Sequence, residues 1–86
     1  MNVAQFNAAL AAGPYAWPGG YPLYFVMADG EALSFKAAEA EADLIRQAIA
    51  DGARDWMPVA IEVNWEDTEL MCVHTNERIE SAYSED

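Results

Sequence analysis

The chain has 86 residues with 15 acidic and 4 basic side chains, which gives a formal net charge of −11 at pH 7. A chain of this length forms one small domain, here residues 1–86, and 53% apolar residues are too many for an intrinsically disordered acidic chain. The negative charge excludes non-specific binding to nucleic acid or anionic membranes, because both need a positive surface. A single cysteine, Cys72, excludes an internal disulfide and a four-cysteine zinc site.

The N-terminal segment predicts a helix followed by a loop. Asn2 is a suitable N-cap, and Val3, Phe6 and Leu10 form one apolar helical stripe. The Gly-Pro pair that follows residue 12 ends the helix, and an aromatic loop then extends to Gly20. No basic segment precedes this helix, so we expect no signal peptide and a cytoplasmic protein.

The next segment predicts a β-hairpin over residues 22–35. Its first strand lies within Tyr21–Ala28, which is far shorter than the roughly 20 residues of a membrane-spanning helix. The Asp29-Gly30 pair between two apolar runs favours a type I′ turn, in which both central residues have positive φ. The partner strand is then Glu31–Phe35.

The second half of the chain predicts a helix and two strands. Ala37–Ala50 is rich in good helix formers, and Gly52 suits the C-terminal cap. The apolar face of this helix comprises Leu44, Ile45, Ala48 and Ile49. Pro58–Trp65 alternates as a half-buried strand, and Leu70–His74 returns after the acidic turn Glu66–Glu69.

The alternation within Pro58–Trp65 assigns its side chains to two faces. The apolar face holds Val59, Ile61, Val63 and Trp65, and the solvent face holds Ala60, Glu62 and Asn64. Residues 76–86 form a polar, partly flexible acidic tail. The order is therefore α-ββ-α-ββ, an α+β domain with a mainly antiparallel four-stranded sheet and helices packed on one face.

Cys72 and His74 are the only pair of soft metal ligands, and their i, i+2 spacing on a strand places both on one side. Two ligands do not complete a tetrahedral zinc site, so a buried cysteine beside a surface histidine is the preferred interpretation. A Cys–His catalytic pair needs positive surroundings, and the nearby acids instead raise the pKa of the cysteine. We therefore predict no metal, no cofactor and no enzymatic activity; a metal-dependent enzyme using this pair and carboxylates is the least favoured alternative.

The remaining candidate features are carboxylates and aromatic rings. Glu62, Glu66, Asp67 and Glu69 lie in or beside a turn, which favours a solvated acidic edge over an acid–base catalytic pair. The aromatic set is Tyr15, Trp17, Tyr21, Tyr24 and Trp65. Core packing is the preferred role of these rings, and an exposed interface or a homodimer through the two-faced apolar segment Tyr21–Ala28 is the alternative.

Three segments carry a family resemblance: PYAWPGGYPLYFV (residues 14–26), VNWED (63–67) and RIESAY (78–83). They are similar to segments of small uncharacterised proteins encoded on phages, plasmids and integrative elements of proteobacteria. Some members carry two Cys-x-x-Cys zinc knuckles, whose positions match Ser34, Ala37, Cys72 and Thr75 here. Because only Cys72 is a cysteine, the resemblance implies a degenerate, zinc-less ribbon whose metal volume is filled by Phe35, Met71 and their neighbours.

Mobile-element origin, acidity and the lack of a catalytic set together favour a binding protein. We expect an inhibitor of a host nucleic-acid-binding defence complex, of the anti-CRISPR type, that acts as a DNA mimic and occupies a basic surface. The expected contact residues are Glu62, Trp65, Glu66, Asp67, Glu69, Glu77, Glu80, Trp17 and Tyr24. The alternative is a metal-free ribbon descendant that serves as a structural or regulatory interaction module through its aromatic face.

Overall fold

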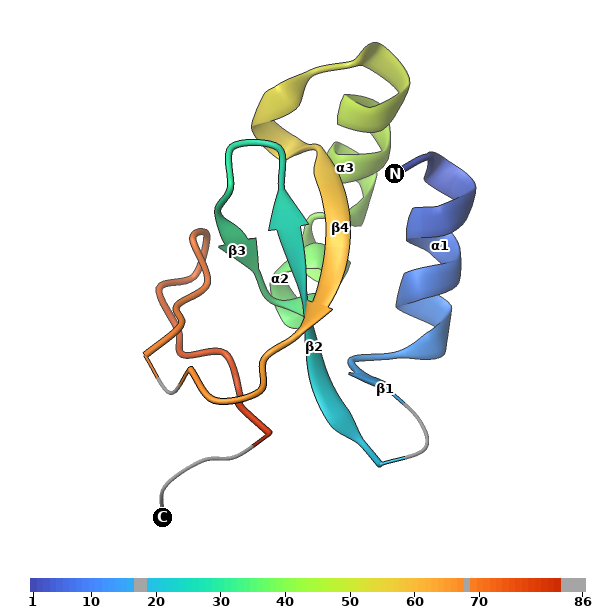
Figure 1. Ribbon diagram of the computed structural model, residues 1–86. Helices are drawn as coiled ribbons and strands as arrows, with labels where there is room; N and C mark the ends of the chain where they lie inside the picture. Colours follow the sequence, from blue (N-terminus) through green and yellow to red (C-terminus); the bar gives the residue numbers. More distant parts are fainter. Residues whose placement is uncertain (17–18, 68, 83–86) are drawn as a thin grey trace.

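The computed structural model describes residues 1–16, 19–67 and 69–82 (Figure 1). Their elements are α1 (Val3–Ala12), β1 (Tyr15–Ala16), β2 (Tyr21–Met27), β3 (Ala32–Leu33), α2 (Phe35–Ala40), α3 (Ala42–Asp51), the 3-10 turn η1 (Arg54–Trp56) and β4 (Pro58–Val63). The α+β class is confirmed. Over these ranges no helix has both the length and the apolar character needed to cross a bilayer.

β2 is the central strand and pairs antiparallel with β1, β3 and β4, so the four-stranded antiparallel sheet is also confirmed. Its fourth strand, however, is β1, which falls in the expected loop, and not Leu70–His74. The latter segment contributes an isolated bridge between Met71 and Arg78 and a backbone hydrogen bond from the amide of Val73 to the carbonyl of Ala32 in β3 at 2.8 Å. It does not extend into a strand because the chain folds back at once: the amide of Asn76 donates to the carbonyl of Cys72 at 2.9 Å.

The β2–β3 hairpin closes through a different turn from the one expected. The carbonyl of Met27 accepts from the amide of Gly30 at 2.9 Å, so Ala28 and Asp29 are the central residues. Asp29 does not have positive φ, whereas Gly30 has φ of 88°. This pattern is a type I turn followed by a left-handed glycine, the usual three-residue hairpin loop, and the type I′ expectation is wrong.

The helix caps at Asn2 and Gly52 form as predicted, but one predicted helix is divided into two. Asn2 caps α1 with a capping box, and Gly52 ends α3 in the left-handed region. The helix predicted over Ala37–Ala50 is interrupted at Glu41, where φ is −110° and ψ is 25°. No glycine or proline signals this break, so tertiary packing sets it: α2 contacts β2, and α3 contacts α1. On α3, Leu44 is 44% exposed and does not join the predicted apolar face.

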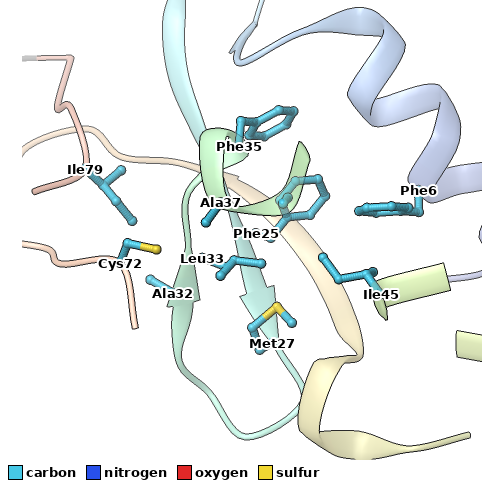
Figure 2. Packing of buried hydrophobic residues seen from close by; sticks show 11 residues of the cluster. Phe6, Phe25, Met27, Ala32, Leu33, Phe35, Ala37, Ile45, Cys72 and Ile79 are labelled. Atoms are coloured by element: carbon cyan, nitrogen blue, oxygen red, sulfur yellow. The ribbon is translucent and has the colours of Figure 1, made fainter. Parts of the chain in front are cut away.

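The core lies between the sheet and the helices (Figure 2). The Phe25 ring stacks on Phe35 with centroids 4.5 Å apart and is tilted against Phe6 at 5.6 Å. Figure 2 shows Phe6 and Ile45 at one end of this cluster and Cys72 at the other. The packing therefore joins side chains from α1, β2, α2, α3 and the C-terminal part of the chain.

The C-terminal segment (residues 64–67 and 69–82) is partly buried. Within the predicted tail over 76–86, Ile79 is 5% exposed and Ser81 4%, and residues 76–78 and 80 are exposed. Residues 83–86 lie outside the described residues. The predicted faces of Pro58–Trp65 also need correction, because β4 ends at Val63 and Asn64 turns inward. Val59 and Trp65, expected on the apolar face, are about half exposed.

Candidate interaction surface

Asn64 organises the end of the sheet where most of the predicted contact residues lie. Its side-chain nitrogen lies 2.9 Å from the carbonyl oxygen of Asp67, 3.1 Å from that of Glu80 and 3.3 Å from that of Ile79. Its backbone amide donates to the carbonyl of Pro22 at 3.0 Å. One buried amide group thus fixes the acidic turn and the C-terminal segment at the end of β4, because a buried polar group is stable only when its hydrogen bonds are made.

Two predicted acids lie beside Tyr24 at this end of the sheet. Glu62 pairs with Tyr24 across β2 and β4, which places their side chains on the same face. Partial burial raises the pKa of Tyr24, and the negative charges of Glu62 and Asp67 raise it further. Because both Glu62 and Asp67 raise the pKa of Tyr24, the two carboxylates lie near the same phenol.

Three more aromatic residues lie at this end of the sheet. The hydroxyl of Tyr15 donates to the carboxylate of Glu80 at 2.8 Å, and this hydrogen bond together with the negative charge of Glu80 raises the pKa of Tyr15. The rings of Tyr21 and Trp65 are tilted against each other with centroids 4.7 Å apart. We call the set Tyr15, Tyr21, Tyr24, Glu62, Trp65, Glu66, Asp67 and Glu80 the aromatic–acidic cluster.

The other predicted contact residues take different positions. Glu69 follows the acidic turn, and its amide donates to the carboxylate of Asp67 at 3.0 Å. Glu77 lies 3.8 Å from the ammonium of Lys36, in an exposed ion pair. It lines a groove of about 420 Å³ together with Glu80, but Lys36 and Arg78 line the same groove and reduce its net charge. Trp17 lies outside the described residues.

Cys72 is fully buried, and its sulfur accepts a hydrogen bond from the amide of Ser34 at 3.4 Å. Burial alone raises the pKa of this thiol, but hydrogen bonds from Ser34 and Thr75 to the sulfur outweigh burial and lower the pKa to about 7. The expectation that neighbouring acids raise it is therefore wrong. These hydrogen-bond partners are two of the positions that the resemblance aligned with zinc knuckles. The fourth, Ala37, is buried in the core and donates its amide to the Ser34 hydroxyl.

The side chains near these positions differ partly from expectation. Phe35 is buried as expected, but Met71 is 46% exposed and does not fill this volume. His74 packs edge-on against the ring of Trp56, with centroids 5.1 Å apart. Among the described residues, no group of three or more His, Cys, Asp or Glu side chains is placed to hold a metal ion.

Sequence reasoning missed the role of Asn64, which it assigned to the solvent face. A local signal was present, because the Asn64 side-chain oxygen accepts from the amide of Asp67, three residues later. Asparagine commonly makes such side-chain-to-backbone bonds where a strand enters a turn. The contact between Tyr15 and Glu80 spans 65 positions, and no local pattern indicates it.

No known family model matches the chain, and comparison with curated proteins and with solved structures gives no significant match.

Proposed function

We propose that the protein is an acidic binding protein that occupies a basic nucleic-acid-binding surface through the aromatic–acidic cluster. One observation carries this proposal. The buried side chain of Asn64 hydrogen-bonds the backbone carbonyls of Asp67 and Glu80, and Glu62 lies in β4, which ends directly before Asn64. Carboxylates held on a fixed backbone present negative charge as a phosphate surface does, and the backbone that carries them needs little further ordering on binding.

Two further properties support this choice. The net charge of −11 favours rapid association with a basic partner, and the rate of that association falls as salt screens the charges. Trp65 is 47% exposed and directly precedes Glu66 in the chain, and it offers the kind of large, semi-rigid ring that anchors interfaces. In its most specific form, the proposal is an inhibitor of the anti-CRISPR type from a mobile genetic element, acting in the cytoplasm of a host bacterium.

The test compares two triple charge reversals that alter net charge equally. E62K/E66K/E80K changes the cluster, and E31K/E39K/D55K changes exposed acids elsewhere; each takes the net charge from −11 to −5. The tagged protein first captures its partner from host lysate, and elution with rising salt isolates the complex. The two variants then compete with a labelled nucleic-acid duplex for the purified partner.

We expect the cluster variant to need about tenfold more protein for half-maximal displacement of the duplex, and the matched variant to stay within about twofold of the unmodified protein. Circular dichroism verifies that both variants fold. Equal loss in both variants would show that overall charge matters and that the cluster is not the binding surface. A captured partner whose duplex binding is unaffected by the protein would refute inhibition by occupancy.

A second function is favoured by the contact between Tyr21 and Trp65. If these rings form the main interface, the protein is a structural or regulatory interaction module of the mobile element. Apolar contacts are weakly screened by salt, so partner binding would then persist at high salt and weaken in W65A or Y24A more than in E62K/E66K/E80K. The ranking of these variants therefore separates the two functions.

A further inference from the structure

β4 has one backbone edge that its pairing with β2 leaves open. The amide of Asn64 donates to the carbonyl of Pro22, so these two residues form a hydrogen-bonded pair. From this pair along β2 and β4, non-hydrogen-bonded and hydrogen-bonded residue pairs alternate, as in any antiparallel ladder. Glu62 and Ala60 consequently direct their backbone groups toward β2, and Ile61 and Val63 direct theirs away. Across the described ranges, β2 is the only strand that pairs with β4.

This edge has the features of a surface that accepts another strand. In Figure 1, β4 lies at the side of the sheet with α1 beyond it, and α1 uses its own backbone groups within its helix. An edge of unpaired amides and carbonyls is a template for an added strand. The edge is also continuous with the aromatic–acidic cluster, since Glu62 belongs to β4 and Trp65 follows it.

A second copy of this chain fits the edge poorly. Twofold antiparallel pairing about Glu62 sets that carboxylate directly opposite its own equivalent, and like charges facing each other across strands are destabilising. Pairing about Ile61 instead sets Val63 opposite Val59. The register shift between β2 and β4 makes β4 irregular at Val59, which disrupts regular pairing there. Two chains of charge −11 also repel each other over their whole surfaces.

We propose that the free edge of β4 receives an extended cationic segment of the partner as an added antiparallel strand. This inference rests on the proposed function and identifies how the same surface is recognised. The segment places apolar residues opposite Ile61 and Val63 and a lysine or arginine opposite Glu62. Its N-terminal end, which antiparallel pairing sets beside Val63, carries further positive charge that faces Glu66 and Asp67.

The test uses the acetylated and amidated peptide KKVKVT, whose two valines pair with Ile61 and Val63 and whose central lysine faces Glu62. We expect saturable binding by titration calorimetry, and amide hydrogen exchange of Ile61 and Val63 slowed at least about tenfold when the peptide is bound. The same peptide N-methylated at both valines retains the charge but lacks the donors that face β4. It should bind at least about tenfold more weakly.

A charge swap tests the cross-strand pair. E62K should weaken binding of KKVKVT by about threefold, and the peptide KKVEVT should recover that loss against E62K. The matched control E39K changes an exposed acid on α2 and should leave the affinity for either peptide within about a factor of 1.5. The swapped peptide can recover the affinity only if its fourth residue faces position 62. General attraction of a cationic peptide to an acidic protein would not produce this recovery.

Several outcomes overturn the proposal. These are no binding of KKVKVT at millimolar concentration, binding that N-methylation leaves unchanged, or no added protection at Ile61 and Val63. Protection of these amides that rises with protein concentration alone, with a dimer in sedimentation equilibrium, would assign the edge to a second copy. The peptide experiments on the β4 edge can fail while E62K/E66K/E80K still competes more weakly than the unmodified protein with the duplex. In that case the proposed function stands, and only strand addition at β4 is rejected.

Discussion

The helix-side core and the C-terminal segment are held together by different interactions. The core relies on rings and aliphatic groups such as Phe6, Phe25 and Phe35, which are at most 4% exposed. The C-terminal segment inserts buried side chains such as Cys72 and Ile79 into the same cluster, and polar hydrogen bonds from Asn64 hold much of the rest. The difference indicates that one region supplies most of the folding free energy and the other positions the candidate surface.

The largest expected effect is in the core. Phe25→Ala removes a ring that contacts both Phe6 and Phe35, and we expect the free energy of unfolding to fall by about 3–5 kcal/mol. For a domain of this size that is a large fraction of the total stability. Urea denaturation followed by circular dichroism measures the loss. The control Val59→Ala, at a half-exposed site, should cost under about 1 kcal/mol; equal costs would show that Phe25 is not central to the core.

Asn64→Ala tests whether the C-terminal segment depends on one polar residue. The substitution leaves the carbonyls of Asp67, Ile79 and Glu80 without their donor, and we expect a loss of about 3 kcal/mol. Amide hydrogen exchange should accelerate at Ile79, while Phe25 retains most of its protection.

Asn64→Asp serves as the matched control for size. It keeps an acceptor for the amide of Asp67 but turns a carboxylate oxygen toward three carbonyls, so it should destabilise at least as strongly as alanine. Uniform acceleration of exchange at Ile79 and Phe25 in both variants would mean that the two regions unfold as one cooperative unit.

The same contrast explains what could be predicted from the sequence. Local signals predicted the cap at Asn2, the glycine end of α3 and the strands β2 and β4, because each depends on neighbouring residues. The break at Glu41 and the pairing of β1 depend on contacts between distant parts of the chain. The burial of Asn64 was missed because alternation assumes a strand that continues past Val63.

The candidate surface was only partly predictable for a related reason. Composition identified its acids, but it did not separate Glu62 and Asp67, which act on Tyr24, from Glu77, which pairs with Lys36. That separation is set by the packing of the C-terminal segment. The free edge of β4 is likewise a property of sheet order, which strand patterns alone do not specify.

Cys72 gives the C-terminal segment a pH dependence of stability. Its pKa in the folded protein is about 7, below an ordinary value near 9, so the folded state stabilises the thiolate. This contribution is fully present above pH 9 and is lost as pH falls through 7. We expect the free energy of unfolding to rise by about 2 kcal/mol from pH 7 to pH 9. Thiolate absorbance at 240 nm measures the pKa, and Cys72→Ser should abolish this rise; an unchanged rise would exclude Cys72 as its source.

The smallest effect belongs to the far end of the helical layer. In Asn2→Ala, α1 loses the side-chain acceptor for the amide of Gln5, which is one of the two bonds of the capping box, and we expect a cost of about 1 kcal/mol. Asn2→Ser keeps a capping oxygen and should recover most of it. The amides of Ile79 and Ala82 should lose no more protection than the global change imposes, because they donate to the carbonyls of Leu70 and Asn64, which lie outside α1. A larger loss there would show that the C-terminal segment depends on α1, and the contrast between core and C-terminal segment would then be incorrect.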